Sequence, residues 1–323
     1  MFEKLDMTRF RDQAVGIATG GKSQEREISL KTGQAFEEAL QSKGYDVTVY
    51  DVATDLEKVL VDRPAAMVLG IHGGLGESGA LQGFLESLEI PYTGSGVLAS
   101  AVAMDKSRAR LLCAAAGVPV ADGHFRSSNN LGDPQTAADR IGEDYGFPVV
   151  AKLNDSGSSF GVYLCQDRAE LVEALEQLQE DVEETSSTGV LIEQFIDGPE
   201  YTVGFFDDRS MGVIEIMPDE KFYDFEAKYQ SDQTGYDVIT DEDICRPLIE
   251  WSKKAIDALG CRGVARVDFK GRPDAPDGVA MLEVNTIPGM TATSLVPKLA
   301  ADSGVAFADF VEAMLVTARL DEG

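Results

Sequence analysis

Residues 282–294 read LEVNTIPGMTATS, and they follow a second informative stretch, RVDF, at residues 266–269. The apolar runs predict two β-strands that we expect to be neighbours, with Asp268, Glu283 and Asn285 at their ends. Carboxylate and amide oxygens on a rigid sheet suit magnesium ions that bridge phosphates. Two acidic residues on strands could equally be surface residues. The turn TIPGMTATS places backbone donors and hydroxyl groups directly beside the acids, which favours a binding site.

Two lysines are further candidates, Lys106 and Lys152. Lys152 is the second-to-last residue of an apolar strand, residues 147–153, which precedes the Gly/Ser-rich loop NDSGSSFG at residues 154–161. A lysine at the end of a buried strand needs an anionic partner. The loop can be an ordinary turn, or it can close over phosphates through its backbone N–H groups. Its position next to Lys152 favours a ligand.

Two other glycine-rich stretches match nucleotide-binding patterns only formally. GIATGGKS, residues 16–23, matches a P-loop, but Gly16 stands inside the apolar strand and the residues that follow are highly charged. GLGESG, residues 74–79, matches a dinucleotide fingerprint, but no strand with an acidic tip follows about 20 residues later. We interpret the first as the end of a strand at Thr19 with a Gly-Gly turn. We interpret the second as a turn leading into a helix.

Composition excludes several classes of protein. The chain has 323 residues, which predicts two or three compact units. Its net charge is −28, with 56 acidic and 28 basic residues, so its surface would repel nucleic acid and anionic lipid. We interpret this negative charge as a feature that keeps the protein soluble or adapts it to salt. Two histidines and four dispersed cysteines make a zinc site improbable. No apolar run is long enough for a membrane span and no signal peptide is visible, so we expect a cytoplasmic protein.

The pattern of elements predicts an α/β protein. Strands and helices alternate in the first ninety residues, which indicates a parallel sheet. Further on, the strands GVLIEQFI and EYTVGFF are separated by Asp197, Gly198 and Pro199, which we interpret as a hairpin-like turn.

The chain resembles the D-alanine–D-alanine ligases of the ATP-grasp superfamily. The resemblance extends from about Val15 onward, and it is most specific in residues 72–110 and 282–300. The other matching stretches, in the same order as in the family, are GGKSQEREISLKTG, GSSFGV, FYDFEAKYQSDQTGY and GVARVDF. The resemblance implies an N-terminal parallel α/β domain, residues 1–94. It also implies central and C-terminal α+β domains, residues 95–190 and 191–323, that clamp ATP between them.

The resemblance also implies a nucleotide site. Lys106, Lys152 and Lys228 would hold phosphates, and the GSSFG loop, which includes Ser159, would cover them. Glu193 would accept a hydrogen bond from the adenine amino group. The backbone near Gln194 and Ile196 would contact the ring edge, Glu200 the ribose and Phe222 the ring face. Asp268, Glu283 and Asn285 would carry two magnesium ions, for which manganese would substitute.

The implied reaction has two steps. The carboxylate of one D-alanine attacks the γ-phosphate of ATP, and the amine of a second D-alanine then displaces phosphate from the acyl phosphate. Glu25 would bind the ammonium group of the first D-alanine, with His72 nearby. Ser294 and the backbone of Leu295 would hold the carboxylate of the second. Arg266 and the N–H of Gly289 would stabilise the oxyanion, and Ser158 and Tyr229 would link to Glu25. The family also suggests a homodimer.

Three features depart from the family pattern. Leu153 stands where the family usually has proline, the loop after it reads NDSGSS, and residues 237–247 replace a Pro-Ala segment. The last of these borders the second-substrate side, so a ligase that joins D-alanine or another amino acid to a different amino or hydroxy acid is the alternative. Tyr229 favours an amine as the nucleophile. A regulator without catalysis is disfavoured by the intact Arg266, Asp268, Glu283 and Asn285.

Overall fold

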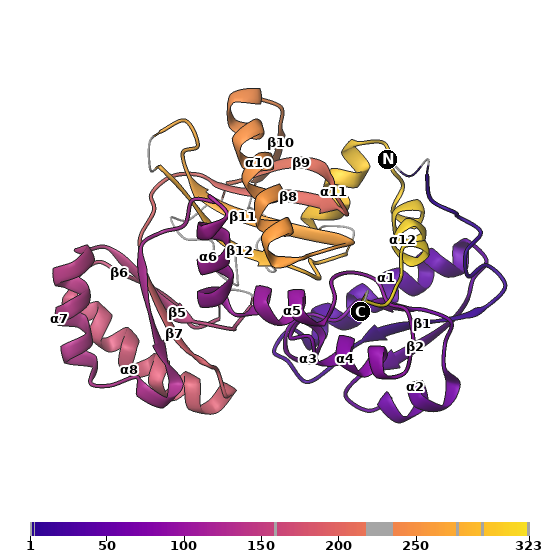
Figure 1. The fold of residues 1–323 in the computed structure, drawn as a ribbon, viewed down its shortest axis with the longest axis horizontal. Coiled ribbons are helices and arrows are strands. Elements are labelled where there is room, and N and C mark those ends of the chain that lie inside the picture. The colour runs from indigo at the N-terminus through magenta and orange to yellow at the C-terminus, as the bar shows by residue number, and fades with distance from the viewer. Residues whose placement is uncertain are drawn as a thin grey trace.

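The computed structural model describes residue 2 and residues 4–157, 160–217, 235–275, 278–291 and 294–321. Three sheets lie in three parts of the molecule, with the five-stranded sheet above and between the other two in Figure 1. Within the described residues, no helix is both long enough and apolar enough to cross a membrane.

The first sheet is parallel, as the alternation of strands and helices predicted. Its strand order is β2-β1-β3, with bounds Asp46–Asp51, Ala14–Thr19 and Met67–Leu69. Helix α1 makes the crossover from β1 to β2, as a parallel pair requires. The helices of this part are α1 (Arg26–Ser42), α2 (Leu56–Asp62), α3 (Gly74–Glu77) and α4 (Ala80–Ser87).

The second sheet is antiparallel, with strand order β4-β7-β5-β6. Its strands are β4 (Gly123–Ser127), β5 (Val149–Leu153), β6 (Val162–Cys165) and β7 (Gly189–Gln194). The 3-10 turn η1 (Ser128–Asn130) follows β4, and α7 (Pro134–Tyr145) and α8 (Arg168–Thr185) bury their apolar faces in one core with the sheet.

The third sheet is also antiparallel, with strand order β10-β9-β8-β11-β12. Its strands are Gly235–Ile239, Arg209–Met217, Glu200–Phe206, Val264–Gly271 and Val279–Asn285 in that order. Helices α5 (Val97–Met104), α6 (Lys106–Ala115) and α10 (Glu242–Leu259) contribute to the core on one side of this sheet.

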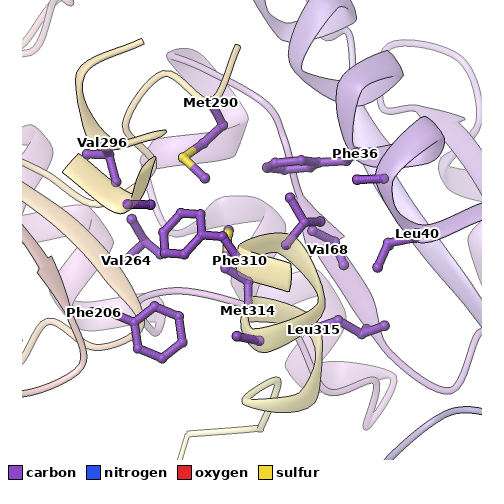
Figure 2. Packing of buried hydrophobic residues seen from close by; sticks show 14 of the residues in the cluster. Phe36, Leu40, Val68, Phe206, Val264, Met290, Val296, Phe310, Met314 and Leu315 are labelled. Carbon is purple, nitrogen blue, oxygen red and sulfur yellow. The ribbon is translucent and has the colours of Figure 1, made fainter. Parts of the chain in front are cut away.

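The C-terminal helices connect the third sheet to the first. Helix α11 (Leu295–Asp302) packs on β8 and β9, and α12 (Phe307–Val316) packs on α1. In Figure 2, Phe310 of α12 lies among Phe206, Val264 and Val296 on one side and faces Phe36 and Val68 on the other. One continuous core therefore joins the two ends of the chain.

The expected hairpin between β7 and β8 is wrong. β7 pairs with β4 and β5, whereas β8 pairs with β9 and β11. The turn at residues 197–199 lets the chain change direction, but here it carries the chain from one sheet to another. The expected domain boundary at residue 190 falls inside β7.

The structure agrees with the rejection of the P-loop. Gly16 lies within β1, and a Cβ added to it would stand 2.8 Å from the sulfur of Met67. Helix α1 begins only at Arg26, beyond the GKS triplet. The glycine pair therefore follows the strand, and the charged residues after it lead into the helix.

Candidate active site

Two adjoining pockets lie where the sheets meet. The first pocket is lined by residues of β5, β7, β11 and β12, among them Lys152, Glu193 and Gln194, together with Lys106 at the start of α6 and Ile196 after β7. The second pocket is lined by Glu25, His72, Arg266, Asn285, Gly289, Ser294 and Leu295. Glu200, Asp268 and Glu283 line both pockets. Every predicted site residue within the described ranges therefore lines one pocket or both.

The first pocket has an ionic wall and an apolar lining. Lys152 and Glu193 are only 7% and 6% exposed, and Lys152 Nζ lies 2.5 Å from Glu193 Oε2. The two side chains share a face because Glu193 stands opposite Val150, two residues before Lys152 on the neighbouring strand. Apolar side chains line much of the pocket: Ala121, Val150, Leu153, Val162, Phe195, Ile196, Met281 and Leu282. A pocket with apolar walls beside buried charges can hold an aromatic ring joined to an anionic group.

The altered loop after β5 fixes the start of α6. Asn154 is fully buried, and its side-chain and backbone oxygens accept hydrogen bonds from the N–H groups of Ser107 and Lys106, at 2.8 and 3.0 Å. Lys106 Nζ then donates to the carbonyl of Ser156 at 2.6 Å. The departure from the family pattern at residues 153–156 thus includes residues that position Lys106 in the first pocket.

The junction of the two pockets is built by cross-strand pairing between β11 and β12. Asp268 stands opposite Glu283, and Arg266 stands opposite Asn285. Because side chains two residues apart share one face of a strand, these four groups converge on the same side of the sheet. The guanidinium of Arg266 donates to Asp268 at 2.8 and 2.9 Å, and Asn285 Nδ2 donates to it at 3.1 Å.

The donor set at this junction fits magnesium. Glu283 and Asp268 offer carboxylate oxygens, and Asn285 donates through its nitrogen, so its amide oxygen is the atom that would bind a metal. In the part of the chain that the structure describes, no three His, Cys, Asp or Glu side chains group into a metal site. Magnesium accepts few protein ligands and takes its remaining oxygens from water and phosphates, so two carboxylates and one amide are sufficient.

Glu25 lies at the entry to α1, in the second pocket. Its Oε2 stands only 2.7 Å from where a Cβ on Gly73 would lie, and 2.8 Å from the corresponding position on Gly157. Gly73 has a φ of +66°. The carboxylate is therefore packed between two backbone segments that only glycine allows to approach so closely.

His72 is buried behind Glu25. Its Nδ1 lies 3.0 Å from the carbonyl of Ile287, and its Nε2 lies 2.9 Å from the hydroxyl of Thr32. Because a carbonyl can only accept, Nδ1 carries the proton, and Nε2 accepts from Thr32 in the neutral ring. Burial lowers the pKa of His72. His72 is therefore a neutral residue that joins α1 to the turn after β12.

The turn after β12 forms the far side of the second pocket. The Ser294 hydroxyl accepts a hydrogen bond from the N–H of Thr291 at 3.1 Å, and α11 begins at Leu295. The N–H groups at the start of a helix favour an anion. A Cβ on Gly289 would stand 3.0 Å from Ser294 Oγ, so glycine keeps this turn tight. The turn can therefore hold a carboxylate.

Sequence reasoning missed Glu77 and Arg110. Glu77 lines the second pocket, and burial together with the nearby charge of Glu25 raises its pKa to about 8. Arg110 lies 3.2 Å from Glu193. Glu77 is the acidic residue within the formal motif GLGESG, and Arg110 follows Lys106 by four residues on one helix. Both signals were present in the sequence.

Five predicted site residues lie outside the described residues. They are Ser158, Ser159, Phe222, Lys228 and Tyr229. Their assignments remain predictions.

Comparisons with known proteins agree with this arrangement. A sequence profile described as "D-ala D-ala ligase C-terminus" matches residues 112–316. The D-alanine–D-alanine ligase of Geobacter sulfurreducens is 42% identical over 97% of both chains, and that of Haemophilus ducreyi is 39% identical over 94% of this chain and 98% of its own. The crystal structure of the Bacillus anthracis ligase complexed with ATP has a TM-score of 0.79 at 29% identity, covering 95% of this chain and 97% of its own. The expected ATP-grasp fold is confirmed, and the chain belongs to the D-alanine–D-alanine ligase family.

Proposed function

We propose that this protein joins two D-alanine molecules to D-alanyl-D-alanine, with ATP converted to ADP and phosphate, for peptidoglycan precursor synthesis. The observation that carries the proposal is the meeting of the two pockets at Glu200, Asp268 and Glu283. A phosphoryl donor in the first pocket and a carboxylate in the second would react at this junction. The similarity to named ligases along nearly the whole chain supports the same reaction.

The first pocket is proposed to hold ATP. Its apolar lining suits adenine, and Glu193, which lines this pocket, is proposed to accept a hydrogen bond from the adenine amino group. Lys106 and Lys152 supply positive charge for the phosphates, and Lys228 and the loop containing Ser159 are proposed to complete the cover. Phe222 is proposed to pack on the ring, and Glu200 to bind the ribose. Gln194 and Ile196 present backbone groups to the ring edge.

Asp268, Glu283 and Asn285 are proposed to hold two magnesium ions, which manganese can replace. When bound, these ions neutralise charge that develops on the transferred phosphoryl group. Arg266 and Lys106 already neutralise Asp268 and Glu283 in the structure, at 2.8 and 3.2 Å.

The second pocket is proposed to hold both D-alanines. Glu25 binds the ammonium group of the first D-alanine. A carboxylate oxygen of that D-alanine attacks the γ-phosphorus of ATP, and ADP leaves with the electron pair of the broken phosphorus–oxygen bond. Ser294 and the N–H of Leu295 hold the carboxylate of the second, whose neutral amine attacks the acyl carbon. The amine loses a proton, and phosphate leaves with the electron pair of the carbon–oxygen bond. Arg266 and the N–H of Gly289 stabilise the oxyanion between these events. Ser158 and Tyr229 are proposed to order Glu25.

A different second substrate is the alternative. Tyr236 lines the second pocket and directly precedes residues 237–247, which depart from the family pattern. The part of the second pocket next to Tyr236 would therefore determine whether a different amino or hydroxy acid is accepted.

The test is phosphate release from ATP with magnesium and D-alanine, followed by a panel of other amino and hydroxy acids. Strong release with D-alanine alone supports the proposal. Release only with a mixed pair supports the alternative. No phosphate release with any of the acids would contradict the proposal and the alternative, and it would favour a regulatory protein without catalysis.

We make three further proposals. We propose a homodimer in the cytoplasm, which sedimentation and cell fractionation would test. We also propose the division into three domains, with the second boundary placed after Gln194 because β7 belongs to the second sheet.

A further inference from the structure

Arg110 stands at the adenine end of the first pocket, although it does not line the pocket itself. It follows Lys106 by four residues on α6, so both side chains extend from the same face of the helix. The side chain of Arg110 is only 13% exposed, and its Nη2 donates to the carbonyl of Ala121, which lines the pocket. The guanidinium is therefore anchored at one end.

Glu193 faces two cations rather than one. Lys152 Nζ lies 2.5 Å from Oε2, and Arg110 Nε lies 3.2 Å from Oε1. Within the described residues, Arg110 Nε is buried without a well-aligned hydrogen bond. Arg110 is thus close to the carboxylate but poorly directed toward it, while Lys152 holds the other oxygen.

Two buried cations against one buried carboxylate leave an excess positive charge, and a buried charge needs a partner. The anion that suits Lys152 is a phosphate of the nucleotide. A lysine that moves from Glu193 to a phosphate would leave the carboxylate without its shorter ionic contact.

We propose that Arg110 is a positioning residue for nucleotide recognition. When ATP draws Lys152 away, Arg110 becomes the ionic partner of Glu193 and holds its carboxylate toward the 6-amino group of adenine. This inference rests on the proposed function of the first pocket. A small rotation of the carboxylate would align Oε1 with Nε–H, and the anchor at Ala121 fixes the direction of the guanidinium.

The neighbouring strand restricts Glu193 to this orientation. Gly123 of β4 stands opposite Glu193, and a Cβ there would lie 2.9 Å from Glu193 Cγ. Glycine at this position admits the stem of Glu193, and the stem directs the carboxylate between Arg110 and Lys152.

The experiment compares ATP with inosine triphosphate, in which a carbonyl oxygen replaces the 6-amino group. Arg110→Met should raise KM for ATP on the order of tenfold, because it removes a charge-assisted hydrogen bond that orients Glu193. KM for inosine triphosphate, KM for D-alanine and kcat with ATP should change little. Arg110→Lys keeps the charge and should recover part of the preference for ATP.

Arg108→Met is the matched control. Arg108 lies on the same helix, but its side chain is 65% exposed and pairs with Asp105. This variant should leave the ratio of the two KM values at the wild-type value.

Several outcomes would overturn the inference. An equal rise in KM for both nucleotides would show that Arg110 acts on folding or on general charge. If the ratio of the KM values for the two nucleotides changed in Glu193→Gln but not in Arg110→Met, Glu193 would recognise adenine without the help of Arg110. If the wild type showed no preference for ATP over inosine triphosphate, neither Glu193 nor Arg110 would have a role in recognising the 6-amino group. Absence of phosphate release with D-alanine and ATP is a separate result, which would contradict the proposed function itself.

Discussion

Glu283 is the residue on which the proposed chemistry depends most directly. It stands opposite Asp268 in the sheet, lines both pockets and pairs with Lys106 at 3.2 Å. Replacing it by glutamine keeps the shape of the side chain and removes one negative charge that would face magnesium and phosphate.

We therefore expect Glu283→Gln to lower kcat by on the order of a hundredfold or more, because the metal would bind weakly. Phosphate release with ATP and D-alanine measures the loss, and a magnesium titration should shift to higher concentration. Glu250→Gln, an exposed change on α10, is the control and should behave as wild type. Near-normal turnover in Glu283→Gln would refute the metal assignment.

The ionisation of Glu77 should make the free energy of unfolding depend on pH. Its pKa is raised to about 8 in the folded protein from an ordinary value of 4.5, first by burial and then by Glu25. The folded state therefore binds this proton more tightly than the unfolded state. The stabilisation is complete below about pH 4.5 and is lost as pH rises through about 8.

Glu77→Gln cannot ionise, so it should escape this loss. We expect the unfolding free energy of the variant, relative to wild type, to rise between pH 5 and pH 8 by at most about 1.4 kcal/mol per pH unit. Urea unfolding of both ligand-free proteins across this range measures the difference. A difference that stays constant with pH would show that Glu77 titrates normally.

At the scale of elements, the segment before β1 joins the two ends of the chain. Arg11 Nη2 lies 2.6 Å from Oε1 of Glu312 on α12, and Glu312 is only 4% exposed. Lys43 and Tyr45, which directly precede β2, approach the same carboxylate at 3.4 and 3.2 Å. Phe2 packs edge-on against Phe206 of β8, with ring centroids 5.1 Å apart. The segment before β1 thus contacts helix α12 and the third sheet.

Arg11→Met should lower the unfolding free energy by roughly 1–3 kcal/mol, because a buried carboxylate loses one of its charged partners. Thermal and urea unfolding measure the effect. The double variant Arg11→Met with Glu312→Gln should lose less than the sum of the single changes. Lys58→Met is the control and should be nearly neutral, because the side chain of Lys58 on α2 is 67% exposed. Strict additivity of the two changes would contradict a direct interaction.

At the scale of the whole molecule, the net charge of −28 is the dominant feature. Like charges on a compact surface repel one another, and unfolding relieves that repulsion. Salt screens it over a Debye length of about 10 Å at 0.1 M and about 3 Å at 1 M.

We expect the melting temperature to rise as KCl increases from 0.05 to 1 M and then to level off, because screening is nearly complete. Differential scanning calorimetry at pH 7 measures the change. Sucrose, which is uncharged, is the comparison, since it stabilises by exclusion and should not show the same saturation. A melting temperature that falls or stays constant with KCl would show that surface repulsion is unimportant here.

Local patterns in the sequence were sufficient for much of the fold and of the candidate site. The apolar run of β1, the position of Gly16 within it and the strands around Asp268 and Glu283 all follow from periodicity over a few residues. Alternation along a strand also places Arg266 with Asp268, and Glu283 with Asn285, on common faces. The order of the motifs along the chain was enough to identify the family.

Tertiary structure alone decided which strands pair and which distant groups meet. The turn between β7 and β8 has the composition of a hairpin, yet the two strands join different sheets, because pairing depends on partners far away in the chain. Arg110 beside Glu193, and Arg11 beside Glu312, follow from the same long-range packing. Sequence periodicity specifies the face on which a side chain lies, but only the packing of whole elements specifies what that face contacts.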